Sequence, residues 1–114
     1  MLNEDVVIDL ITVVTEKDVI DQVVEKLRTT STIFGKLKSI GQKEFYEAGR
    51  SGFQPDICVV VYDFEYHDEA IVRLDSKLYS VYRAYYVPGC DRVELYLEER
   101  GGTKDEPDSS NSGS

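Results

Sequence analysis

The sequence predicts a mainly β domain, a small antiparallel β-barrel or sandwich with one short helix. Several segments rich in β-branched and aromatic residues alternate between apolar and polar positions. Short turn signals separate them, such as Asp75-Ser76-Lys77 and Pro88-Gly89-Cys90-Asp91. Residues 41–49 combine good helix formers with apolar side chains three positions apart. Consecutive strands with short connections are typical of such barrels and sandwiches.

The first half of the chain contains two predicted strands and the predicted helix. Residues 6–14 are almost continuously apolar and predict a strand with little exposure to solvent. Residues 32–40 alternate less cleanly but also predict a strand. The helix within residues 41–49 places Phe45 and Ala48 on one side, and Gly49, Gly52 and Pro55 mark its end.

Residues 15–27 allow two interpretations. Their apolar residues are spaced as one helical stripe, with Thr15 as N-cap, and periodicity alone favours this helix. The alternative is a turn near Lys17 and Asp18, followed by a strand from about residue 22 to residue 30. The β-favouring residues 29–32 support this second interpretation.

The second half predicts four strands. Residues 57–66 are interpreted as one long strand in which Cys58, Val60 and alternate residues up to Tyr66 form a uniformly apolar face. The opposite face changes from apolar to acidic at Asp63. Residues 70–74, 78–87 and 92–99 complete the predicted sheet.

One domain accounts for residues 1–100 of the 114. Residues 101–114 contain no large apolar side chain, so we expect a disordered C-terminal tail. The formal net charge is −9, which argues against nonspecific binding to nucleic acid. No apolar run is long enough to span a membrane, and no export signal is visible, so we expect a soluble protein from a reducing cytoplasm.

No arrangement of residues predicts an enzyme. His67 is the only histidine and lies in an apparent surface turn, and Cys58 is expected to act as a small apolar residue. Cys90 lies beside Asp91, whose charge disfavours a thiolate. The acidic residues between 63 and 69 lack the spacing of a calcium loop. We therefore predict no catalytic residue, no metal site and no cofactor.

Eight tyrosines and no tryptophan are present. Tyrosine occurs on both faces of the segment containing Tyr79, Tyr82, Tyr85 and Tyr86. These four residues are a candidate interface with another subunit, because tyrosine is enriched at interfaces. The alternative is that they cover the ends of a small core.

The segment Lys38-Ser-Ile-Gly-Gln-Lys-Glu-Phe-Tyr-Glu-Ala48 resembles the phage head–tail connector family, also called head closure, head completion or stopper proteins of tailed bacteriophages and prophages. The resemblance covers about residues 5–99. It continues through Gly52-Phe-Gln-Pro-Asp56, Tyr66 and Glu69, then residues 78–85 and 93–95.

This resemblance implies a structural role at the virion neck, with assembly in the host bacterial cytoplasm. Members form a homo-oligomeric ring below the portal or adaptor ring, close the DNA-filled head and provide a surface on which the tail docks. DNA passes through the channel without specific binding, and no membrane is involved. The subunit is expected to be monomeric or loosely associated in solution.

The resemblance also implies particular features of the chain. It favours a hairpin over a helix for residues 16–28, with a turn near residues 17–21 and a strand from about Gln22. The candidate channel and gating segment comprises Lys43, Glu44, Glu47, Arg50 and Gln54, although the same helix could instead plug one end of the barrel. An acidic DNA mimic, or another small protein-binding β module, is the alternative function.

Overall fold

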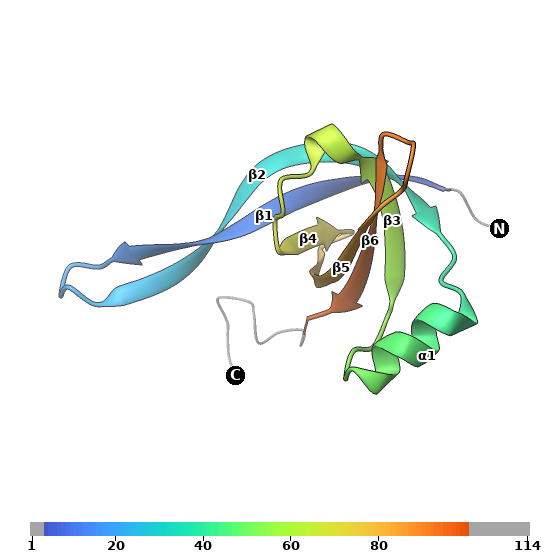
Figure 1. The fold of residues 1–114 in the computed structure, drawn as a ribbon. Helices are drawn as coiled ribbons and strands as arrows, with labels where there is room; N and C mark the ends of the chain where they lie inside the picture. The colour runs from blue at the N-terminus through green and yellow to red at the C-terminus, as the bar shows by residue number, and fades with distance from the viewer. Residues whose placement is uncertain (1–3, 101–114) are drawn as a thin grey trace.

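The computed structural model describes residues 4–100, which form a closed antiparallel barrel of six strands in the order β1-β2-β3-β6-β5-β4 (Figure 1). This confirms the predicted fold class. The elements are β1 (Asp5–Lys17), β2 (Val23–Lys38), α1 (Gln42–Arg50), β3 (Ile57–Tyr62), the 3₁₀ turn η1 (Asp63–Glu65), β4 (Ile71–Leu74), β5 (Lys77–Tyr86) and β6 (Arg92–Glu99). The predicted disordered tail, residues 101–114, lies outside the described residues.

The barrel interior is filled by aliphatic side chains that alternate along the strands. Those under 2% exposed include Ile8, Leu10, Val72, Leu95 and Leu97. Such close packing of branched side chains is the main source of stability in a domain of this size.

The face of β3 that carries Val59 and Val61 points into the barrel. Val59 and Val61 belong to the core cluster, whereas Tyr62 is exposed. Cys58 is fully buried but lies on the opposite face, where it pairs across the strands with Tyr96. The Cys58 face of β3 is apolar, as predicted, but it points away from the barrel interior, and it is exposed at Tyr62.

β3 also ends at Tyr62, before the predicted boundary at Tyr66. The backbone N–H of Asp63 donates to the carbonyl of Asp91, and the chain then enters η1. Tyr66 is buried in the core, and its hydroxyl donates to the carbonyl of Glu69 at 2.8 Å. The turn, and not a longer strand, brings Tyr66 to the core.

Residues 15–27 form a β-hairpin, so the helix favoured by periodicity was wrong and the hairpin interpretation is confirmed. β1 and β2 pair from Asp5 with Lys36 out to Lys17 with Val23. At the turn, Asp18 Oδ1 accepts from the backbone N–H groups of Ile20 and Gln22, at 3.0 and 2.9 Å. The Asp18 side chain thus stabilises a tight turn and not a helix start.

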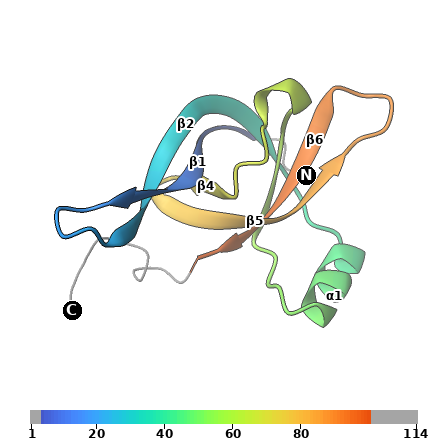
Figure 2. The same ribbon diagram turned by 60° about the vertical axis from the view of Figure 1, so that its left-hand side comes forward.

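The outer part of this hairpin projects from the barrel as an arm, defined here as residues 12–30 (Figures 1 and 2). β4 pairs with β1 only at residues 9–11, and β3 pairs with β2 only at Lys36–Lys38. Beyond these contacts the arm is a two-stranded ribbon. In both views it lies on the opposite side of the molecule from α1.

Among the described residues, no helix combines the length and the apolar character needed to cross a bilayer.

Candidate functional site

A groove of about 620 Å³ lies between α1 and the outer wall of the barrel formed by β5 and β6. Its lining includes Lys43, Glu44 and Glu47 of α1, and Tyr82 and Arg83 of β5. The groove therefore joins parts of the candidate channel segment to one residue of the candidate tyrosine interface.

Local sequence features position α1 against the barrel. The helix begins after Gly41, whose backbone is extended, and ends where the N–H groups of Ser51 and Phe53 donate to the carbonyl of Ala48. Ala48 is the buried residue of the helix. Phe53, just beyond the helix, stacks on Tyr82 with ring centroids 4.9 Å apart. These contacts hold the C-terminal end of a short helix whose own hydrogen bonds would not stabilise it in water.

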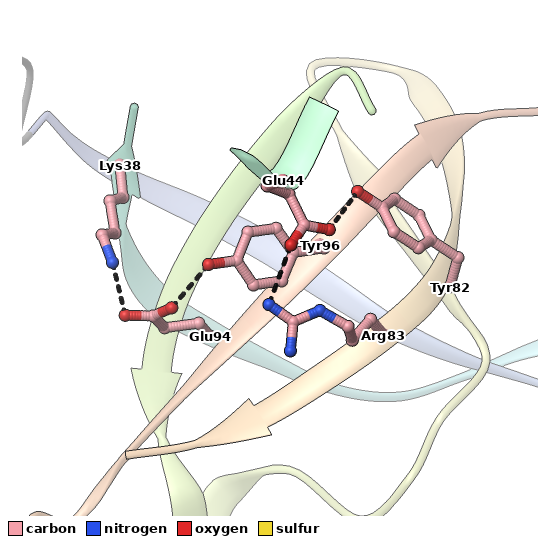
Figure 3. Close-up of polar contacts among 6 residues, drawn as sticks. All are labelled: Lys38, Glu44, Tyr82, Arg83, Glu94 and Tyr96. Carbon is pink, nitrogen blue, oxygen red and sulfur yellow. Dashed lines mark hydrogen bonds and ion pairs between the residues drawn. The ribbon is translucent and has the colours of Figure 1, made fainter. Parts of the chain in front are cut away.

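Glu44 forms the polar link between the helix and the barrel (Figure 3). Its two carboxylate oxygens accept hydrogen bonds from the Tyr82 hydroxyl and from Arg83 Nη2, both at 2.9 Å. The Glu44 side chain is 14% exposed, so this ion pair is partly withdrawn from water. A partly buried carboxylate with two donors has a fixed orientation.

A second polar cluster continues the network across the barrel wall. The Glu94 carboxylate accepts from Lys38 Nζ at 2.6 Å and from the Tyr96 hydroxyl at 2.7 Å. The Arg83 guanidinium lies 4.5 Å from the centre of the Tyr96 ring, which joins this cluster to Glu44. Figure 3 shows the six side chains of the combined network converging from β2, α1, β5 and β6.

The pKa shifts in this network keep the tyrosines neutral and the Glu94 carboxylate charged. Burial, followed by the hydrogen bond to a carboxylate, raises the pKa of both Tyr82 and Tyr96. Burial alone would raise the pKa of Glu94, but the hydrogen bonds from Lys38 and Tyr96 outweigh it and lower that pKa. The tyrosines thus stay protonated and Glu94 stays ionised through neutral pH, which suits a structural or recognition surface.

The structure brings together only some of the residues predicted for the channel segment. Lys43, Glu44 and Glu47 line the groove. The side chain of Arg50 instead lies over the ring of Tyr46 at 5.8 Å. Gln54 lies outside the groove lining, and its backbone N–H donates to Glu98 Oε1 at 3.4 Å.

The four candidate interface tyrosines occupy different environments. Tyr79 is buried in the barrel core, as the alternative interpretation of these residues expected. Tyr82 lines the groove, whereas Tyr85 and Tyr86 are 41% and 49% exposed near the end of β5. The last two are therefore the members of this group that are open to another subunit.

Sequence reasoning did not identify four residues of the network, namely Lys38, Arg83, Glu94 and Tyr96. Lys38 and Glu94 lie 56 positions apart and meet only because β2, β3 and β6 are neighbours in the sheet. One usable signal was Tyr96, a large aromatic side chain placed between the inward-facing Leu95 and Leu97. A tyrosine on the outward face of a strand indicates that something covers that face.

The other candidate groups do not line this groove, although Cys58 lies behind it as the strand partner of Tyr96. Burial raises the pKa of the Cys58 thiol to about 12, and Cys90 is exposed. His67 is also exposed, with Nδ1 3.9 Å from the buried Glu69 carboxylate. Within residues 4–100, no three histidine, cysteine or acidic side chains lie close enough to hold a metal ion.

Comparison with known proteins identifies the fold and no family. No family model matches the chain, and no curated protein matches it. The structure is similar to the solution structure of protein SF1141 from Shigella flexneri 2a, with a TM-score of 0.65 and 13% sequence identity. The match covers 89% of this chain and 95% of that protein. At this identity the similarity shows a shared fold and nothing about activity.

Proposed function

We propose that this chain is a structural virion assembly protein that forms a ring below the portal, closes the DNA-filled head and provides a docking surface for the tail. It acts in the virion neck after assembly in the host cytoplasm. Its partners are further copies of itself, the portal or adaptor ring, and tail proteins.

The observation that carries this proposal is the position of the segment that resembles the connector family. Residues 38–48 begin at the end of β2 and continue through most of α1. Lys38 and Glu44, from the two parts of this segment, both anchor to the barrel wall through ion pairs. The segment thus holds α1 at one end of the barrel, where Lys43 and Glu47 remain exposed.

The charge distribution supports a channel that passes DNA without holding it. The chain carries 22 acidic and 13 basic residues, so a ring of copies presents a net negative field to the phosphate backbone. Several carboxylates pair with lysine or arginine, including Asp5, Asp9, Glu44 and Glu94. Such pairing differs from the continuous row of free carboxylates that a DNA mimic needs, and it favours the connector role.

The proposal is tested by mixing the purified full chain with portal rings from the same phage or prophage and imaging the complexes by electron microscopy. We expect an additional ring of density at the narrow end of the portal. A portal that remains unchanged at saturating protein would contradict the proposal. Inhibition of host nucleases without portal binding would instead support a DNA mimic.

A further inference from the structure

Two exposed apolar surfaces lie outside the groove, and the first is the arm. Val19 and Ile20 at its turn are 100% and 67% exposed, and Val23 is 66% exposed. The strand register pairs Val13 with Leu27 and Lys17 with Val23, so Val13, Val23 and Leu27 share one face of the ribbon with the charged Lys17 and Glu25. Val14 and Val24 lie on the other face. That face also carries charged side chains such as Lys26 and Glu16, which pair at 3.3 Å. The arm therefore exposes a group of apolar side chains, Val13, Val19, Ile20, Val23 and Leu27, of which those at and beside the turn are the most exposed.

The second surface lies on the outer wall of the barrel. We define the wall patch as Val7, Phe34, Tyr62 and Phe64, which are 53%, 74%, 40% and 64% exposed. Val7 pairs with Phe34 across β1 and β2, and Tyr62 stacks on Phe64 with ring centroids 5.2 Å apart. Phe34 and Tyr62 border one shallow hollow of about 140 Å³.

The geometry prevents one copy from covering its own wall patch with its own arm. Both surfaces include residues of β2, and Val23 of the arm and Phe34 of the wall patch lie eleven positions apart on that strand. At about 3.3 Å per residue, this is a path of roughly 36 Å along the strand. The molecule measures 50 × 29 × 24 Å, and the arm points away from the barrel. The arm can therefore reach a wall patch only on another molecule.

We propose that the exposed apolar side chains of the arm of one copy, chiefly Val19, Ile20 and Val23 at its turn, pack against the wall patch of the next copy. The inference rests on the proposed function and deepens it by naming the surface through which the ring subunits contact each other. One chain carries both halves of the contact, so copies can repeat it head to tail, and such a series closes as a ring. A two-stranded ribbon is marginally stable alone, so the arm gains stability when it is covered.

The sizes of the two surfaces favour a weak contact between copies. Exposed apolar patches on monomers reach about 300–600 Å², whereas a stable interface buries about 800 Å² on each partner. Four partly exposed side chains fall within the first class. A single contact then dissociates readily, and closure of a ring, in which each copy makes two contacts, stabilises the assembly.

Two complementary variants test the proposal with the protein alone. The arm variant carries Ile20→Asp and Val23→Asp, and the patch variant carries Phe34→Glu. All three positions are at least 66% exposed, so the monomer should fold, and circular dichroism verifies this. Sedimentation velocity at protein concentrations up to about 1 mM is expected to show association of the wild type. Each variant should associate at least about tenfold more weakly, because a charge is costly in an apolar contact.

The mixture of the two variants distinguishes head-to-tail contact from other arrangements. The arm variant retains a wall patch and the patch variant retains an arm, so the mixture should form 1:1 dimers and nothing larger. If two wall patches paired with each other, the arm variant alone would still associate. That result would contradict the proposal, as would a wild type that stays monomeric at about 1 mM.

Cysteine pairing gives the position of the contact. In a Cys90→Ser background, protein with Ile20→Cys is mixed with protein carrying Phe34→Cys under a glutathione redox buffer. Because a disulfide requires Cα atoms within about 7 Å, we expect more mixed disulfide than with Gln42→Cys on α1 as the control partner. Equal yields would contradict the proposal. Portal binding without this disulfide would leave the proposed function standing and refute only the arm contact.

Discussion

Glu44 is the residue on which the docking of α1 most depends. Its replacement by alanine removes the carboxylate that accepts hydrogen bonds from the Tyr82 hydroxyl and from Arg83. Both donors then remain at the surface of the barrel without that acceptor. Since a hydrogen bond to a charged group contributes about 1–3 kcal/mol, and Arg83 is partly exposed, we expect Glu44→Ala to lower the free energy of unfolding by about 1–2 kcal/mol.

Urea denaturation measures this loss, and hydrogen exchange of the α1 amides shows where it occurs. Glu47→Ala is the matched control, because Glu47 lies one turn along the same helix and is exposed. We expect the control to change stability by less than about 0.5 kcal/mol. Equal effects of the two substitutions would show that Glu44 does not anchor the helix.

Gly35 is required by the close approach of β2 to β3. A Cβ at this position would lie 2.7 Å from Val59 Cγ1 and 3.1 Å from the carbonyl oxygen of Val60. Overpacking of this kind costs about 1–3 kcal/mol, so Gly35→Ala should lower the melting temperature. Gly49→Ala should leave stability unchanged or raise it by up to about 1 kcal/mol, because Gly49 lies in α1 and a Cβ there would meet no atom within 4 Å beyond its own stretch of helix. Differential scanning calorimetry compares the two, and a neutral Gly35→Ala would contradict the packing argument.

Cys58 gives a pH dependence whose sign follows from its burial. Burial, with a contribution from the charge of Glu94, raises the pKa of the folded thiol to about 12 from 9.0. Between these values the unfolded chain loses a proton that the folded chain keeps, so stability decreases as pH rises. The decrease is at most about 1.4 kcal/mol per pH unit for this group.

Urea denaturation between pH 7.5 and 10.5 checks this prediction in the wild type and in Cys58→Ala. The pKa values of the tyrosines at positions 66, 82 and 96 are also raised, and they contribute a similar decrease in both proteins. The difference between the two slopes therefore isolates the thiol. Parallel slopes would show that Cys58 ionises normally in the folded state.

At the scale of elements, the sequence predicted most strands because their alternation reflects burial. The two turns around residues 75–77 and 88–91 were also readable, since β5 begins at Lys77 and β6 at Arg92. The segment 15–27 was not predicted from its periodicity, because valines and isoleucines exposed at and beside a hairpin turn can have the same spacing as the apolar stripe of a helix. Its helical stripe of Val19, Ile20 and Val23 consists of exposed residues of the arm and its turn.

The site was less predictable than the fold because its residues come from segments that are far apart in the sequence. Lys43, Glu44 and Glu47 share one helix, so their proximity follows from local periodicity. The partners of Glu44 come from β5, whose position opposite α1 depends on closure of the barrel. A local pattern in one sequence does not specify on which strands of a closed barrel a helix packs.

The arm is expected to be dispensable for folding of the barrel. Val14 pairs directly with Lys26, so residues 15–25 can be replaced by Asn-Gly, a sequence suited to a two-residue hairpin turn. A ribbon without further packing contributes little stability. The free energy of unfolding of the shortened protein should therefore lie within about 1 kcal/mol of that of the wild type. Urea denaturation measures this, and sedimentation should show lost self-association. A collapse in stability would show that the arm supports the barrel.

The extended shape of the molecule favours contact between copies, whereas its net charge opposes it. The radius of gyration is 15.5 Å, above the about 13 Å of a compact domain of 100 residues, because the arm extends beyond the barrel. This extension provides reach toward a neighbouring copy. The net charge of −9 opposes the approach of that copy.

The balance between these two effects predicts an unusual response to salt. Raising ionic strength from about 0.01 to 0.1 M shortens the screening length from about 30 to 10 Å and weakens the repulsion between copies. The proposed contact between arm and wall patch is apolar and is not screened. Sedimentation velocity should therefore show stronger association of the wild type as sodium chloride increases, while Phe34→Glu stays monomeric throughout. Association that weakens with salt would mean that ion pairs hold the copies together, since screening reduces attraction between opposite charges in the same way that it reduces repulsion.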